Sequence, residues 1–192
     1  EKYLQSCDGK ISDQSIVLAY SNADVASYNK RIREEFFPDS PKVANGDKVM
    51  FIRNNYNHEF VISNGDFGFI NRVFGETEQR TILLKNKNEE TNEVEEIKVP
   101  LEFRDVELEF RDFEGEARLF KTKVLENLLY NKSVDLSSDE NKALYVDFCM
   151  RNNRIKPGSL EFKETLKSDP YFNALRIKFG YAITTHKAQG SE

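Results

Sequence analysis

The first apolar run of the chain, Ser15–Tyr20, has the length of a β-strand and shows no alternation with polar residues. Such a run is typical of a strand that is buried on both faces, as in a parallel sheet. Ser21 and Asn22 follow it, and both residue types are good helix N-caps. The next apolar positions recur at helical spacing: Val25, Tyr28, Ile32 and Phe36. We therefore expect a strand and then an amphipathic helix that ends before Pro38, which is the start of an α/β unit.

The pattern changes near Val43, where short apolar runs alternate with turns. Asn45–Asp47 and Ser63–Asp66 contain the Asn-Gly and Gly-Asp pairs that favour tight turns between antiparallel strands. Further short strands are expected at Thr81–Leu84, Val94–Val99, Leu101–Phe110 and Ala117–Lys121. Several short strands with close turns predict a small β-barrel inserted into the α/β unit.

Helical spacing returns after the barrel. Four apolar residues form one face of a first expected helix: Val124, Leu125, Leu128 and Leu129. Ser138–Asn152 and Leu160–Leu166 predict two more helices. The last apolar run, Leu175–Ala182, is strand-like, and we expect residues 175–181 to lie in the same sheet as Ile16–Tyr20.

The net charge of −5 comes from one internal stretch of the 192 residues. Residues 76–118 hold 14 acidic and 7 basic side chains, and the rest of the chain holds 19 acidic and 21 basic ones. This distribution is compatible with nucleic-acid binding but does not support it by itself. No apolar run is long enough to span a membrane, and no secretion signal opens the chain.

The sequence contains no self-contained catalytic motif. No phosphate-binding G-x-x-x-x-G-K-[ST] loop occurs, and neither histidine has a partner at the spacing of a nucleophilic triad. Cys7, Cys149, His58 and His186 are too scattered for a zinc site, which favours a reducing, cytosolic compartment. We expect His58 to be a surface or hairpin residue. The basic side chains Lys30, Arg31 and Arg33 are expected on a solvated helix face.

The C-terminal run Tyr181–Glu192 (YAITTHKAQGSE) resembles motif V of superfamily 1 helicases, most closely the RecD/TraA-like branch that includes the exodeoxyribonuclease V alpha subunit. Ser15–Asn29 is similar to the strand and helix that open the second RecA-like domain of that family. Asn45–Asn57 and Ser63–Ile70 resemble the start of its SH3-like insert. Residues 76–169 resemble nothing that we can name.

The resemblance implies an α/β fold in which a partial RecA-like domain (1–42 and 171–192) is interrupted by an SH3-like β-barrel (43–122) and a helical segment (123–170). It implies the C-terminal portion of a cytoplasmic, ATP-dependent DNA helicase that moves 5′ to 3′, and it leaves open whether the role is in DNA repair, recombination, conjugation or a mobile element. Single-stranded DNA and ATP are the expected partners, and other repair or recombination subunits are compatible with it. ATP and Mg would be held mainly by a first domain that precedes this chain, so we expect the fragment alone to be inactive.

The resemblance also assigns site residues, none of them catalytic and none of them metal-binding. The expected DNA contacts are Ser21, Asn22, Asn54, Asn55, Tyr56, Thr184, His186 and Lys187. The expected nucleotide contacts are Gln189, Gly190, Ser191 and Glu192. The residue types suit these roles, because hydroxyl, imidazole and ammonium groups bind phosphate oxygens and an aromatic ring can stack on a base.

Structural explanations compete with each assignment. Ser21 and Asn22 are equally well explained as helix caps. Asn54–Tyr56 is more simply explained as residues that shape a hairpin, and Thr184–Lys187 taken alone would be a capped helix with a solvated lysine. For the whole chain, the alternative is a standalone SH3-like module that binds nucleic acid or protein without ATPase activity. A complete small enzyme of another kind is disfavoured by the missing catalytic motifs.

Overall fold

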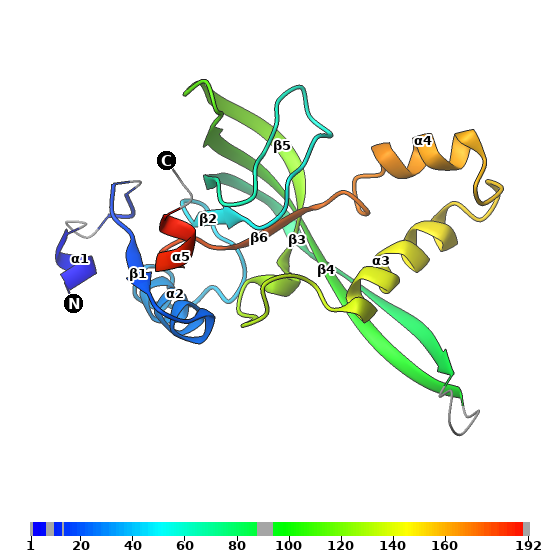
Figure 1. The fold of residues 1–192 in the computed structure, drawn as a ribbon, viewed down its shortest axis with the longest axis horizontal. Coiled ribbons are helices and arrows are strands. Elements are labelled where there is room, and N and C mark those ends of the chain that lie inside the picture. The colour runs from blue at the N-terminus through cyan, green and yellow to red at the C-terminus, as the bar shows by residue number, and fades with distance from the viewer. Residues whose placement is uncertain (1, 7–9, 13, 88–93, 190–192) are drawn as a thin grey trace.

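The computed structural model describes residues 2–6, 10–12, 14–87 and 94–189, which form a mixed α/β structure (Figure 1). A two-stranded sheet with one long helix lies at one end, a barrel lies in the middle, and a long hairpin with two helices forms the other end. The elements in chain order are α1 (Lys2–Ser6), β1 (Val17–Ala19), α2 (Asn22–Phe36), β2 (Lys48–Phe51), β3 (Phe67–Lys87), β4 (Val94–Arg111), β5 (Ala117–Leu125), a 3₁₀ turn (Glu126–Leu128), α3 (Ser138–Arg151), α4 (Leu160–Ser168), β6 (Leu175–Phe179), β7 (Ala182–Thr184) and α5 (Thr185–Ala188).

The expected strand and helix at the start are present as β1 and α2. β1 pairs in parallel with β7, so that Val17 lies opposite Ala182. α2 packs against this pair, and the buried Asn29 side chain makes two hydrogen bonds to the backbone of Ala182 (3.2 and 2.7 Å). The expectation that β1 is buried on both faces is wrong for this chain. Leu18 is 53% exposed and Tyr20 is 92% exposed, because α2 covers only one face of the pair.

The middle of the molecule is a closed barrel with the strand order β2–β3–β4–β5–β6. Gly46 and Gly65 have positive φ angles, as the predicted tight turns require. β6 closes the barrel because it pairs antiparallel with β2 and parallel with β5. Along β6 the side chains of Leu175, Ile177 and Phe179 point into the core, and the two residues between them do not.

Closure by β6 corrects the predicted assignment of the last apolar run. Residues 175–179 belong to the barrel and not to the sheet of β1, so the barrel is not confined to residues 43–122. The segment that joins β1 is the next one, β7. The change of sheet occurs at Gly180, where a Cβ atom would lie 3.0 Å from the Val49 backbone. The apolar run Leu175–Ala182 therefore contributes to strands of two different sheets.

Two further predictions from the pattern are wrong in detail. The four short strands expected between residues 81 and 121 are parts of longer ones, since β3 and β4 pair over most of their length and continue past the barrel as an arm. Pro100 lies inside β4, in the part that pairs with β3 but not with β5. Its missing N–H therefore removes no hydrogen bond to a second neighbouring strand. Val124 and Leu125 end β5 and are not helical, and Leu128 closes the 3₁₀ turn.

The helices α3 and α4 are confirmed, each with a serine N-cap. Ser137 and Glu140 form a capping box at α3, and Ser159 accepts a hydrogen bond from the Phe162 N–H at α4. α3 packs on the arm through Leu144 and neighbouring apolar side chains.

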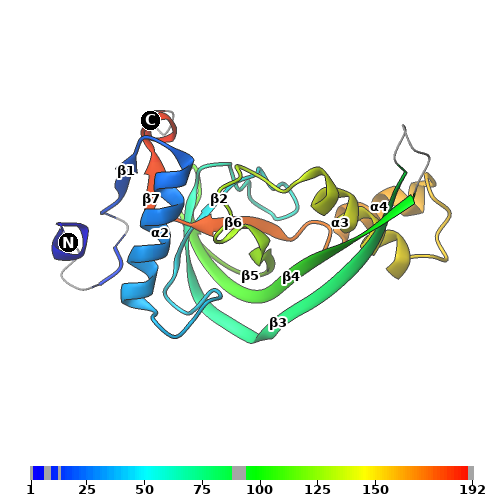
Figure 2. The same cartoon turned by 90° about the horizontal axis from the view of Figure 1, so that it is seen from below.

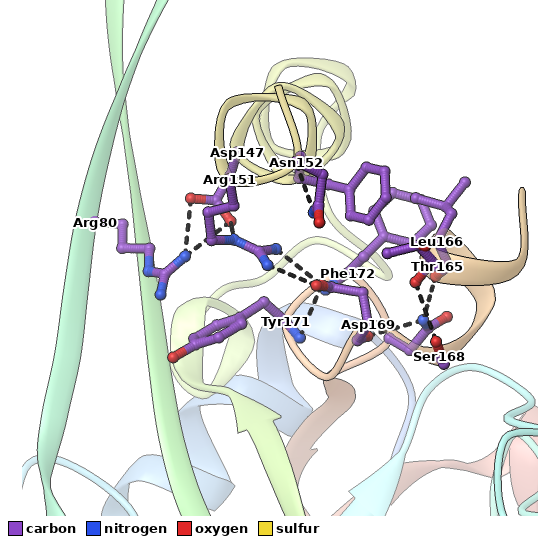
Figure 3. Close-up of polar contacts among 12 residues, drawn as sticks. Arg80, Asp147, Arg151, Asn152, Thr165, Leu166, Ser168, Asp169, Tyr171 and Phe172 are labelled. Atoms are coloured by element: carbon purple, nitrogen blue, oxygen red, sulfur yellow. Dashed lines mark hydrogen bonds and ion pairs between the residues drawn. The ribbon is translucent and has the colours of Figure 1, made fainter. Parts of the chain in front are cut away.

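A network of charged side chains adds to this attachment (Figure 3). Arg80 of the arm bonds to Asp147 of α3 at 3.1 Å, and Arg151 bonds to both Asp147 (2.8 Å) and Asp169 (2.5 Å). The Tyr171 ring lies under the guanidinium of Arg80, 3.7 Å from its central carbon to the ring centroid. We call these five residues the arm network.

Arg33, which was expected on a solvated helix face, is packed inside. Arg33 is 1% exposed and bonds to Asp47 at 2.9 Å, and Tyr181 donates a hydrogen bond to the same carboxylate at 2.6 Å. Burial raises the pKa of Asp47, although the Arg33 charge and the hydrogen bonds to the carboxylate oppose this. His58 is half-buried, stacks on Phe60, and has its pKa lowered by burial. Lys30 and Arg31, as expected, are exposed.

Candidate nucleic-acid interface

The start of α2 and the start of α5 lie next to each other, although about 160 residues separate them in the sequence (Figure 2). Between them is a small hollow of about 40 Å³. Its polar lining includes Asn22 of α2, Lys178 of β6, and Thr184 and Lys187 at α5. We call it the α2–α5 hollow. It brings together three of the residues that the sequence assigned to DNA contact.

Ser21 and Asn22 have different roles at the start of α2. Ser21 is the N-cap: its hydroxyl accepts a hydrogen bond from the Asp24 N–H (3.1 Å) and donates one to the Asp24 carboxylate (2.7 Å). This arrangement favours the helix-cap explanation for Ser21. The side chain of Asn22 is exposed and lines the α2–α5 hollow, so its amide is accessible to a ligand.

α5 begins at an N-cap threonine. The hydroxyl of Thr184 accepts a hydrogen bond from the Lys187 N–H at 3.4 Å and so caps the helix. The same side chain also lines the hollow. His186 is exposed and does not line the hollow. Gln189 is the exposed C-cap of α5. Gly190, Ser191 and Glu192 lie outside the described residues.

The two lysines give the hollow its electrostatic character. Burial lowers the pKa of Lys187 and also that of Lys178, and the charge of Lys187 lowers the pKa of Lys178 further. Lys178 donates a hydrogen bond to the Asn131 carbonyl at 2.9 Å. No carboxylate is among the described residues that line the hollow. Because two neighbouring ammonium groups repel each other, an anion at this position would be stabilised by both.

The loop that follows β2 extends from this hollow toward the helical end of the molecule. Lys187 Nζ lies 3.3 Å from Asn64 Oδ1, and the Asn64 N–H donates to Asn54 Oδ1 at 2.7 Å. Asn54 then donates to the Tyr56 hydroxyl at 2.9 Å. The two predicted DNA-contact segments are therefore linked by a chain of polar contacts through Asn64.

Within this loop the three predicted residues differ in what they offer a ligand. Asn55 has a structural role, because its backbone pairs with Ile62 and its amide donates to the Asn173 carbonyl at 3.2 Å. Asn54 is exposed, although both ends of its amide are hydrogen-bonded within the loop. Tyr56 is 68% exposed and its hydroxyl accepts a hydrogen bond from Asn54, so the ring offers surface for stacking.

The site has the groups for binding phosphate, sugar and bases. Among the described residues, no cluster of three or more His, Cys, Asp or Glu side chains could hold a metal ion. In the same part of the chain no helix has the length and apolar character that a membrane crossing requires. A scan of known protein families found no model that matches this sequence, and no curated protein matches it either.

Sequence reasoning missed Lys178, Asn64 and Arg53 as members of this surface. Lys178 lies in a strand whose sheet was assigned incorrectly. Asn64 belongs to a turn whose Asn-Gly signal explains it fully as a structural residue. Arg53 directly precedes Asn54–Tyr56, and its charge beside exposed amides and an aromatic ring was the signal that could have identified it.

Proposed function

We propose that this chain is the single-stranded-DNA-contacting portion of an ATP-dependent DNA helicase of the RecD/TraA-like type. The observation that carries the proposal is the α2–α5 hollow. Asn22, Thr184 and Lys187 come from two distant segments, both of which resemble the same helicase domain, and they line one surface beside a second lysine. Lysines supply the charge that binds phosphate, and the amide and hydroxyl groups fix the register of the strand.

The finer fold assignment belongs to the same proposal. The parallel pair β1–β7 with α2 on one face supports a partial RecA-like domain, and the five-stranded barrel supports an SH3-like insert. The chain has no phosphate-binding loop of its own. ATP and Mg would be bound mainly by another domain, with Gln189, Gly190, Ser191 and Glu192 reaching the nucleotide. The helicase would move 5′ to 3′ in the cytoplasm, with repair or recombination subunits as candidate partners.

The DNA part of the proposal is tested by fluorescence anisotropy of a labelled oligo-dT with the purified chain. Lys187→Ala should weaken binding by about tenfold at low salt, because one charged phosphate contact is lost. It should also reduce the slope of log K against log salt by about 0.7. Lys163→Ala is the matched control, since it removes the same charge from an exposed position of α4. Equal affinities for both variants, or no binding by the wild-type chain, would contradict the proposal.

The second candidate is a standalone SH3-like module without ATPase activity. The feature that favours it is the barrel, which closes within the chain and has its own core of buried side chains from all five strands. The two candidates differ in the protein of which this chain is a part. Single-stranded DNA should stimulate its ATP hydrolysis if the helicase proposal is correct, and Lys187→Ala should reduce that stimulation. The absence of ATP hydrolysis by that protein, with or without DNA, would favour the module.

A further inference from the structure

A larger pocket continues the polar surface onto the helical segment, to which the resemblance assigns no role. It has a volume of about 390 Å³ and lies between the loop 53–57, helix α3 and the approach to β6 at residues 172–176. This volume falls in the range of about 300–1,000 Å³ that is common for small-molecule sites. The pocket is thus large enough for a group the size of a nucleoside, unlike the α2–α5 hollow.

An open groove connects the pocket to the α2–α5 hollow. The groove shares Ile52 with the hollow, and it shares Arg53, Tyr56 and Arg176 with the pocket. Asn64, which contacts Lys187, lines the groove as well. In Figure 2 the chain that follows β2 extends along the molecule toward α3. A strand that touches Lys187 therefore lies next to the groove that leads to the pocket.

The walls of the pocket are held in place by amides that bond within the protein. Asn55 donates to the Asn173 carbonyl, which joins the loop 53–57 to the segment before β6. Asn141 donates to the Leu136 carbonyl at 3.1 Å and accepts a hydrogen bond from Arg176 at 2.7 Å. The three walls are therefore preorganised, which lowers the entropic cost of binding a ligand between them.

Other groups that line the pocket are available to stack on a ligand or to form hydrogen bonds and ion pairs with it. Tyr56 and Tyr145 present ring surface, since they are 68% and 42% exposed. Among the described residues, Arg53 has no ion-pair partner and the Asn57 side chain has no hydrogen bond. No carboxylate is among the described residues that line this pocket. Aromatic faces, an amide and a guanidinium suit a base together with its phosphate, and the absence of carboxylates avoids repulsion.

The charge of Arg53 acts on this part of the surface. Asp135 lines the connecting groove and pairs with Arg176 at 2.7 Å. Burial acts to raise the pKa of Asp135, but the hydrogen bonds from Arg176 and Leu136 and the charges of Arg176 and Arg53 lower it below its usual value. The one carboxylate of the groove is therefore neutralised within the protein, and Arg53 adds a positive charge beside it.

We propose that this pocket binds one nucleobase of the single strand that crosses the α2–α5 hollow, with the base stacked on Tyr56 and Tyr145 and its phosphate at Arg53. The helical segment is then a DNA-binding element. This inference rests on the proposed function, because the strand must first be bound. Stacking tolerates every base, so the pocket should accept any sequence.

Photocrosslinking tests the placement without any substitution. An oligo-dT that carries 5-iodouracil at single positions is irradiated with the wild-type chain, and the crosslinked peptides are mapped by mass spectrometry. We expect crosslinks in the peptides that contain Tyr56 and Tyr145. Crosslinks confined to other peptides, with DNA still bound, would overturn the pocket and leave the proposed function intact.

Variants give the energetic test by anisotropy with the same oligo-dT. Tyr56→Ala and Tyr145→Leu should each weaken binding by about 5- to 100-fold. Tyr28→Leu is the matched control, because Tyr28 is similarly exposed (47%) and does not line the pocket, groove or hollow. Circular dichroism melts of all variants exclude unfolding as the cause. Wild-type affinity in both pocket variants overturns the pocket alone, and failure of the wild-type chain to bind DNA overturns both proposals.

Discussion

The arm network and the α2–α5 hollow use charged side chains in opposite ways. In the arm network the two carboxylates, Asp147 and Asp169, are each 7% exposed and bond to guanidinium groups. In the hollow, Lys178 bonds to backbone carbonyls, and the lining contains no carboxylate among the described residues. The charges of the arm network are neutralised by one another and hold the structure together. In the hollow, two ammonium groups lie beside amide and hydroxyl groups, a combination that suits contact with an anion.

The largest loss of stability is expected from removing the central carboxylate of the arm network. Asp147→Ala leaves Arg80 and Arg151 with one carboxylate each, Glu78 and Asp169, so we expect a cost of about 3 kcal/mol, the lower end of the range for a buried ion pair. Urea denaturation followed by circular dichroism should therefore show a large loss in the free energy of unfolding.

A matched control for Asp147→Ala is Asp139→Ala in the first turn of the same helix, where the carboxylate is half-buried and forms no ion pair with another described residue. Its loss should cost no more than about 1 kcal/mol, from the helix dipole. If both variants are equally stable, the arm network does not hold α3 to the arm.

Acid should remove a smaller part of the same stabilisation. Burial acts to raise the pKa of Asp169, but hydrogen bonds from Arg151 and from the Phe172 N–H and the Arg151 charge lower it below the usual 3.8. A carboxylate whose pKa is lower in the folded state stabilises the fold fully above its unfolded pKa. This stabilisation is lost as the pH falls through the folded value.

Asp169→Asn removes that charge at every pH. We expect the variant to be less stable than the wild type by about 1–3 kcal/mol at pH 7, and the difference to shrink as the pH falls from 4 toward 2. Urea titrations at several pH values measure it. A difference that stays constant over this range would show that the Asp169 charge contributes nothing to stability.

Much of the local structure could be predicted because its signals are short-range. α2, α3 and α4 have serine caps and apolar spacing, and each was found close to its expected bounds. β6 could not be assigned to its sheet, since one apolar run covers both β6 and β7 and only the packing at Gly180 separates them. Nothing in the local pattern distinguishes the buried Arg33 from Lys30 or Arg31, because its partner Asp47 is brought to it by the barrel.

The candidate site likewise contains residues that the sequence could identify and residues that it could not. Asn22, Thr184 and Lys187 could be selected from their own segments, and the structure brings them to one hollow. Lys178 could not, because its relevance depends on where β6 lies in three dimensions. Residues of a continuous segment are visible to a motif, whereas residues that only share a surface are not.

The smallest expected effect tests how far the hollow extends along α5. His186 is exposed and lies outside the lining, yet the resemblance assigns it to the DNA backbone. A single hydrogen bond to a phosphate contributes about 0.5–1.5 kcal/mol, so His186→Ala should weaken oligo-dT binding by about two- to tenfold, less than the pocket variants at their upper limit. His186→Asn, which keeps a hydrogen-bond donor, should recover part of the loss. If His186→Ala binds DNA as the wild type does while Lys187→Ala does not, the contact surface ends at Lys187. His186 would then serve only the short capped helix in which it lies.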